Sequence, residues 1–142
     1  MPDRYDLQRF VDAQAPVYER VQSELTAGRK HGHWMWFIFP QIEGLGYSNT
    51  ARKYAISNIA EAQAYLQHRL LGRRLIECTE LVTAVQGNSI NAILGSPDDM
   101  KFRSSMTLFA HAAEDNQVFR DALEKYYGGQ EDPLTVEKLS SG

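Results

Sequence analysis

Apolar residues recur at intervals of three and four along almost the whole chain, and they hardly ever alternate with polar residues. This period places side chains on one face of a helix, whereas a half-buried strand needs a period of two. The sequence therefore predicts an all-α protein of about six to seven helices packed into one compact bundle. The clearest stripe joins Leu71, Leu75, Cys78, Val82 and Val85.

Capping residues, glycines and prolines mark the expected helix ends. Asn58 followed by Glu61 has the form of a capping box, and Ser96 before Pro97 is the expected cap of a later helix. Gly28 and Gly128 suit left-handed helix ends. These signals predict helices at about residues 7–13, 16–28, 48–56, 58–68, 69–85, 97–113 and 116–127, a turn at 90–94 and a last helical turn after residue 133.

Length and composition fit a single helical domain over residues 1–142. A chain of this size buries roughly two thirds of its unfolded surface and needs no disulfide or metal for stability. Cys78 is the one cysteine, so no disulfide can form within the chain. Its position on the apolar stripe predicts a packed core thiol.

No apolar run is long enough to cross a bilayer, and Met1-Pro2-Asp3-Arg4 does not resemble a signal peptide. We therefore expect a soluble, cytoplasmic protein with no membrane partner. The formal net charge of −3 and the pI near 5.8 argue against nucleic acid as a partner, because such domains usually have a basic excess. The sequence makes no prediction about oligomeric state.

The segment from His33 to Gln41 contains both tryptophans of the chain, two phenylalanines and a methionine. A continuous apolar run fits a buried helix and a buried strand equally well. Aromatic faces stack on flat ligands, and the flanking imidazole and amide add directional hydrogen bonds. The segment is therefore either part of the core or the wall of a pocket.

A candidate ligand site joins this aromatic segment to polar residues beyond the glycine turn at 44–46. Stacking faces, an amide, hydroxyls and cations suit a nucleotide or ribosyl ligand. The alternative places the tryptophans in the core and the cations on the solvated surface. The candidate ligand-binding residues are His33, Trp34, Trp36, Gln41, Ser48, Arg52, Tyr54, Lys101 and Ser105.

Asp98 and Asp99 are the candidate catalytic residues. On a helix, Asp98 and Ser105 flank the apolar stripe, whereas Ser104 and Thr107 point away from it. A carboxylate at the edge of a buried face can activate water as a general base. In the structural alternative both aspartates stabilise the helix start, and Ser105 bonds to a carbonyl group one turn earlier.

No known nucleophile motif, phosphate-binding loop or dinucleotide fingerprint occurs in the sequence. His31 and His33 have the spacing of a metal pair but lack further ligands, so we expect no metal and no other cofactor. The sequence leaves open whether the protein is an enzyme. The rival hypothesis is a non-catalytic module that docks a protein partner through the Trp34–Gln41 segment.

Several motifs are distinctive: Leu7-Gln8-Arg9-Phe10, Ala13-Gln14, the segment 33–41, Gly44-Leu45-Gly46, Pro97-Asp98-Asp99 and the segment 104–109. Together they resemble the bacterial family known as domain of unknown function 1810. The resemblance spans nearly the whole chain, and it implies a mainly helical fold without an established activity. Some members of that family are labelled calpastatin, but nothing here resembles a disordered, repeat-based protease inhibitor.

From Glu61 onward, the order of motifs is also similar to the NADAR superfamily, a small helical fold linked to NAD and ADP-ribose. The segments concerned are 71–74, the helix that contains Met106, and 116–123. That superfamily includes N-glycosidases that act on phosphoribosylated or ADP-ribosylated substrates. This likeness implies a nucleotide or ADP-ribose-type ligand and, for an enzyme, hydrolysis of the N-glycosidase type.

Overall fold

The computed structural model describes residues 4–141, and over this range it contains ten helices and no strand. The predicted all-α class is confirmed, but the predicted number of about six to seven helices is wrong. Three helices exceed that number. Met35–Ile38 and Ile90–Leu94 have only four and five residues, which is too short for a periodic pattern to reveal, and Pro133–Ser141, predicted as a single helical turn, has nine residues. The helices are α1 (Gln8–Gln14), α2 (Tyr18–Ala27), α3 (Met35–Ile38), α4 (Asn49–Lys53), α5 (Ile59–Gln67), α6 (Arg69–Ala84), α7 (Ile90–Leu94), α8 (Asp98–Ala112), α9 (Gln117–Tyr127) and α10 (Pro133–Ser141).

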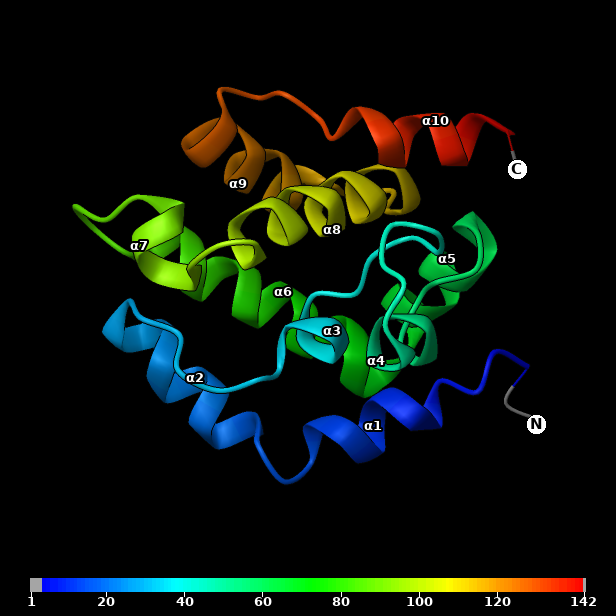
Figure 1. Ribbon diagram of the computed structural model, residues 1–142, viewed down its shortest axis with the longest axis horizontal. Coiled ribbons are helices and arrows are strands. Elements are labelled where there is room, and N and C mark those ends of the chain that lie inside the picture. The colour runs from blue at the N-terminus through cyan, green and yellow to red at the C-terminus, as the bar shows by residue number, and fades with distance from the viewer. Residues whose placement is uncertain (1–3, 142) are drawn as a thin grey trace.

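Helix α6 runs through the middle of the molecule (Figure 1). It contacts α1, α2, α3, α5 and α9. Helix α8 packs on α5, α7, α9 and α10. In Figure 1, α1 and α2 therefore lie below α6, and α8, α9 and α10 lie above it. Among residues 4–141, no helix combines the length and the apolar character that a membrane span requires.

One continuous hydrophobic core extends from Leu7 to Leu123. The ring of Tyr65 lies 5.1 Å from that of Phe10 and 5.4 Å from that of Phe109, measured between centroids, and so joins α1, α5 and α8. Four members of the predicted stripe, Leu71, Leu75, Cys78 and Val82, are buried in α6, and Val85 is partly buried just past its end. The burial of Cys78 confirms a packed thiol, and it raises the pKa of that thiol to about 12.

A buried carboxylate fixes the loop that leads into the aromatic segment. Oε1 of the buried Glu24 accepts hydrogen bonds from the N–H groups of His31 at 2.7 Å and Gly32 at 2.9 Å. It also accepts one from the indole Nε1 of Trp34 at 2.9 Å. Burial by itself raises the pKa of Glu24, but these three bonds outweigh it, and the pKa lies below its ordinary value. Glu24 thus fixes the loop that leads into α3.

Arg9 and Glu61 fix the segment that surrounds α4. Arg9 donates to the carbonyl oxygens of Lys53 at 2.7 Å and Ala55 at 2.9 Å, and it pairs with Glu61 at 2.9 Å. The side chain of Asn58 accepts a bond from the Glu61 N–H, which confirms Asn58 as the cap of α5. These bonds hold residues 53–58 in place beside α1.

The start of α8 differs from the prediction. Pro97 occupies the N-cap and no side chain caps the helix, so the predicted capping role of Ser96 is wrong. The N–H of Asp99 donates instead to the carbonyl oxygen of Gly95 at 2.8 Å, and the N–H of Met100 donates to the carboxylate of Asp99 at 2.9 Å. The first turn is therefore satisfied by backbone and by its own aspartate.

We expect Glu24→Gln to lower the free energy of unfolding by about 1–3 kcal/mol at pH 7, because bonds to a charged acceptor become bonds to a neutral one. The pKa of Glu24 is lower in the folded chain than its ordinary value of 4.5. The stabilisation by the carboxylate is therefore present above that value and is lost as the pH falls through the folded pKa. Urea titrations from pH 7 to pH 3 should show a weaker acid loss in the variant.

The control is Glu114→Gln, since Glu114 is exposed and has no bonding partner among residues 4–141. Equal unfolding free energies for the two variants at pH 7 would contradict the structural role of Glu24.

Candidate functional site

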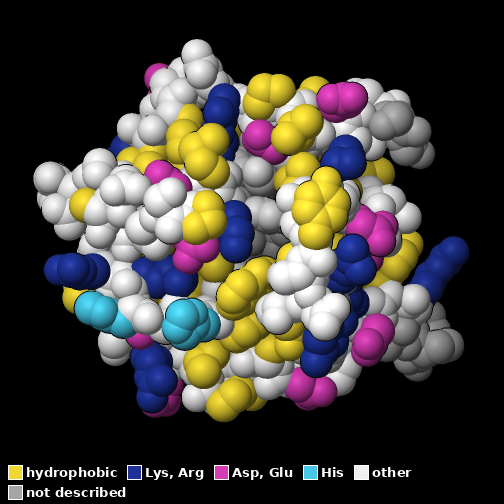
Figure 2. Space-filling view, viewed as in Figure 1, with side chains coloured by type: hydrophobic (Ala, Val, Ile, Leu, Met, Phe, Trp, Pro, Cys, Tyr) yellow, Lys and Arg dark blue, Asp and Glu magenta, His cyan; other side chains and the backbone are white. Residues whose placement is uncertain are grey.

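A small pocket of about 30 Å³ lies where α3, α4 and the first turns of α8 meet. In Figure 1 these segments surround the middle of the view, and Figure 2 shows a hollow there, bordered by hydrophobic and basic side chains. We call it the Trp36 pocket. Its lining residues are Met35, Trp36, Phe39, Gln41, Ile42, Glu43, Gly44, Gly46, Ala51, Arg52, Tyr54, Ala55 and Lys101.

A single bridge between Ile42 and Ile56 forms one wall. The N–H of Glu43 donates to the carbonyl oxygen of Ile56 at 2.8 Å, and the N–H of Ile56 donates to that of Gln41 at 2.9 Å. This pairing holds residues 41–43 extended, so Gln41 and Glu43, two positions apart, both reach the pocket. The opposite wall is α4, which presents Arg52.

Three polar side chains of the pocket are free to bind a ligand. Among residues 4–141, the side chains of Gln41, Glu43 and Arg52 form no hydrogen bond and no ion pair with one another or with the rest of the protein. They offer an amide, a carboxylate and a guanidinium group from two walls of the pocket. Polar groups that converge on a concave surface in this way are typical of ligand sites.

Lys101 is held over the indole of Trp36. Its Nζ lies 4.9 Å from the ring centroid of Trp36 and 3.6 Å from Oδ1 of Asp98. The other carboxylate oxygen of Asp98 pairs with Nζ of Lys30 at 2.9 Å. Two ammonium groups therefore share one carboxylate, and Asp98 positions the Lys101 cation at the pocket.

Five of the nine predicted ligand-binding residues line the Trp36 pocket: Trp36, Gln41, Arg52, Tyr54 and Lys101. The structure does not bring the other four there. His33 is exposed elsewhere, and Trp34 and Ser105 are buried in the core. Ser48 caps α4 by accepting a bond from the Ala51 N–H at 3.1 Å, and it lies in an adjoining groove.

The candidate catalytic residues lie beside the pocket and do not line it. Asp98 is engaged by Lys30 and Lys101, as described. Asp99 accepts a bond from Asn91 at 3.2 Å, in addition to the one from the Met100 N–H. Glu43 is the carboxylate of the lining, and the sequence prediction missed it. The signal in the sequence was that Glu43 lies two residues after Gln41, because an extended segment places such residues on the same side.

An open groove of about 550 Å³ continues from the pocket. We call it the Tyr47 groove. It lies between the loop at 45–48, the start of α8 and the start of α10. Its lining residues are Trp36, Gln41, Leu45, Gly46, Tyr47, Ser48, Ala51, Pro97, Met100, Lys101, Ser104, Asp132 and Leu134.

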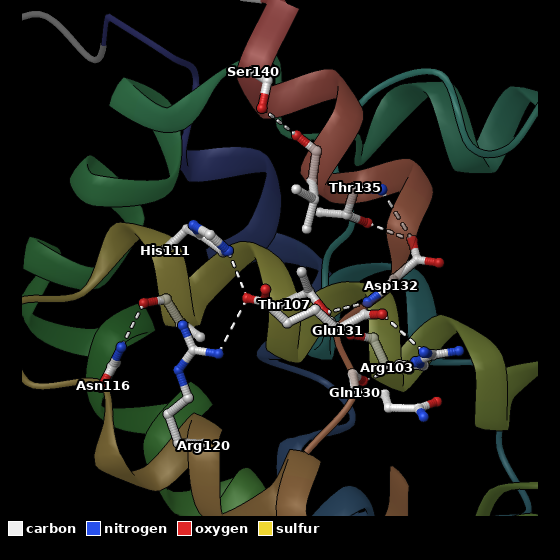
Figure 3. A network of polar contacts seen from close by, with 12 residues as sticks. Arg103, Thr107, His111, Asn116, Arg120, Gln130, Glu131, Asp132, Thr135 and Ser140 are labelled. Carbon is white, nitrogen blue, oxygen red and sulfur yellow. Dashed lines mark hydrogen bonds and ion pairs between the residues drawn. The ribbon is translucent and has the colours of Figure 1, made fainter. Parts of the chain in front are cut away.

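Asp132 fastens α10, one wall of this groove, to α8 (Figure 3). Its Oδ2 accepts bonds from the hydroxyl groups of Ser104 at 3.0 Å and Thr135 at 2.6 Å. Its N–H donates to Oγ1 of Thr107 at 2.9 Å. Ser104 and Thr107 thus face α10, whereas the buried Ser105 hydroxyl has no partner among the described residues. The predicted bond from Ser105 to a carbonyl group is therefore wrong.

Glu131, the residue before Asp132, is bonded as well. Its Oε2 lies 2.5 Å from Nε2 of His111 and 3.1 Å from NH1 of Arg120 (Figure 3). Arg103 donates to the carbonyl oxygens of Gln130 at 3.0 Å and Glu131 at 2.8 Å. The connection from α9 to α10 is thus tied to α8 by side chains. Within residues 4–141, no group of three or more His, Cys, Asp or Glu side chains is arranged to hold a metal ion.

The fold and the site define a small all-α protein with a small pocket at the α3–α4–α8 junction that opens onto a larger groove. The chain belongs to the family described as Protein of unknown function (DUF1810), whose model matches residues 4–139. The expected resemblance to this family is confirmed. The weaker likeness to the NADAR superfamily stays a prediction.

A solved structure agrees with this fold. The crystal structure of the conserved hypothetical protein Rv1873 from Mycobacterium tuberculosis is 63% identical in sequence, covers 97% of this chain and 99% of its own, and has a TM-score of 0.96. No match is found among curated proteins. These similarities therefore establish the fold and the family of the chain, and they assign no activity to the pocket.

We expect opposite results from two neighbouring substitutions on α8. Thr107→Ala should lower the free energy of unfolding by about 1–3 kcal/mol, because the Asp132 N–H loses its acceptor. Ser105→Ala should leave that free energy unchanged within about 0.5 kcal/mol or raise it, because the lost hydroxyl had no partner. Urea denaturation at pH 7 measures both. A loss of similar size in Ser105→Ala would show that its hydroxyl is bonded.

Proposed function

We propose that the protein binds a small phosphorylated metabolite of the nucleotide or ribosyl type in the Trp36 pocket. The observation that supports this most directly is the set of unpartnered Gln41, Glu43 and Arg52 side chains in one concavity. The pocket itself is small, about 30 Å³, but it opens onto the adjoining Tyr47 groove of about 550 Å³, so a ligand anchored on these side chains has room to extend.

The charges and hydrogen-bonding groups of the lining suggest the ligand class. Arg52 presents a planar fork of donors that matches a phosphate group, and Lys101 adds a second cation. Gln41 both donates and accepts, and Glu43 accepts, which suits the hydroxyl groups of a ribose. Trp36 and Tyr54 provide flat apolar surface beside these groups.

The competing function, protein docking through the Trp34–Gln41 segment, is less well supported. Interface anchors have to be exposed before the partner binds. Most of this segment is buried, and the Trp34 indole is already bonded to Glu24. Only Trp36, Phe37 and Gln41 are partly exposed; the buried members are Trp34, Met35, Ile38, Phe39 and Pro40.

Hydrolysis of an N-glycosidic bond is a second step of the proposal and needs a base near the ligand. Glu43 occupies the lining and has no internal partner. For Asp98 or Asp99 to serve as the base, either would have to leave the partners that now hold it. We therefore favour Glu43 as the base and Asp98 as the group that positions Lys101.

We expect ribose 5-phosphate to bind and Arg52→Ala to weaken that binding by about 10- to 100-fold, the value of a lost charge-assisted bond. Isothermal titration calorimetry measures the affinity. The matched control is Lys53→Ala, which removes an equal charge from the same helix but outside the lining. The proposal fails if wild type binds none of ribose 5-phosphate, AMP and ADP-ribose, or if both variants lose affinity equally.

If the protein is a hydrolase, Glu43→Gln should lower the rate of hydrolysis of an ADP-ribose N-glycoside by roughly 10²- to 10⁴-fold, because the amide cannot take a proton from water. Asp99→Asn should retain the wild-type rate. The assay compares equal amounts of folded protein. A large loss in Asp98→Asn or Asp99→Asn with full activity in Glu43→Gln would return the catalytic role to those aspartates.

A further inference from the structure

We infer that the ligand of the Trp36 pocket has a second part, flat and apolar, that lies in the Tyr47 groove. The site would then accept a two-part phosphate ester, such as a sugar phosphate joined through phosphate to a nucleoside. This inference rests on the proposed function, because the pocket has to bind the first part.

The pocket and the groove are continuous. Trp36, Gln41, Gly46, Ala51 and Lys101 line both of them. A ligand seated in the pocket therefore reaches the groove without crossing other parts of the protein. The Lys101 ammonium lies at this junction, held there by Asp98 and by the face of Trp36. A cation at the junction suits a phosphate group that links two halves of one ligand.

The groove concentrates exposed apolar surface. Tyr47 is 78% exposed, Met100 50% and Leu134 56%, and all three line the groove. They come from three separate segments: the loop at 45–48, α8 and the start of α10. The fourth large apolar residue exposed within residues 4–141, Ile76, lies on α6 away from the groove. Such a gathering is typical of a binding surface, because large apolar side chains are otherwise scattered singly.

Apart from Gln41, which the groove shares with the pocket, and the Tyr47 hydroxyl, the polar side chains of the groove are already bonded within the protein. The Asp132 carboxylate is occupied by Ser104 and Thr135, and the Ser48 hydroxyl accepts a bond from the Ala51 N–H. The surface left for a ligand is the phenol ring of Tyr47 and the thioether of Met100, with Leu134 opposite. Rings and sulfur favour the face or edge of another aromatic ring. A nucleobase fits this chemistry better than a second sugar phosphate.

The experiment compares two probes that share a ribosyl phosphate, ribose 5-phosphate and ADP-ribose, by isothermal titration calorimetry. Wild type should bind ADP-ribose at least tenfold more tightly. Tyr47→Ala and Met100→Ala should each reduce that advantage about fivefold or more, because base stacking on the groove is lost. Ile76→Ala, which removes an exposed apolar side chain elsewhere, should retain the full advantage.

The outcomes separate this inference from the proposed function. If ribose 5-phosphate binds and ADP-ribose binds no more tightly, the inference is overturned and the proposed function stands. If neither probe binds wild type, the inference is overturned, and if AMP does not bind either, the proposed function fails with it. An advantage that survives in both groove variants overturns the inference, as does self-association of wild type that Tyr47→Ala abolishes while the advantage persists.

Discussion

The site depends on the carboxylate of Glu24. This one group accepts bonds from two backbone N–H groups and from the Trp34 indole, and it thereby fixes the loop between α2 and α3. A short helix such as α3 cannot form by propensity alone, because nucleation of a single turn is unfavourable. Burial of Trp34 on one side of α3 leaves Trp36 on the pocket side, where Lys101 covers its ring.

Charged side chains in this region form a series of contacts that starts in the same loop. Lys30 donates to the carbonyl oxygen of Gly32 and pairs with Asp98, which in turn holds Lys101. These side chains are only partly exposed, so they are screened less by solvent than surface pairs are. These ion pairs connect the loop fixed by Glu24 to the first turn of α8. The position of the pocket cation therefore depends on Lys30 and Asp98, which do not line the pocket, as well as on Trp36, which does.

The aromatic segment shows how core and pocket can share one short stretch. Trp34, Ile38 and Phe39 face inward and make up part of the core, whereas Trp36 and Gln41 remain half-buried at the surface. The core interpretation of this segment therefore applies to Trp34, Ile38 and Phe39. The pocket interpretation applies to Trp36 and Gln41. Similarly, Ser104 and Thr107 face away from the apolar stripe of α8 and are nevertheless buried, because the start of α10 covers them.

The sequence by itself determined the helical class, the long helices, the stripe of α6 and the cap at Asn58, because each depends on residues close together in the chain. It also indicated Trp36, Gln41, Arg52, Tyr54 and Lys101. Only tertiary structure decided that Trp34 is buried, that Glu43 reaches the pocket and that α10 walls the groove. The burial of Trp34 depends on Glu24, the position of Glu43 on the Ile42–Ile56 bridge, and the position of α10 on Asp132. Each of these contacts joins segments far apart in the sequence, and the periodicity of apolar residues gives no information about such contacts.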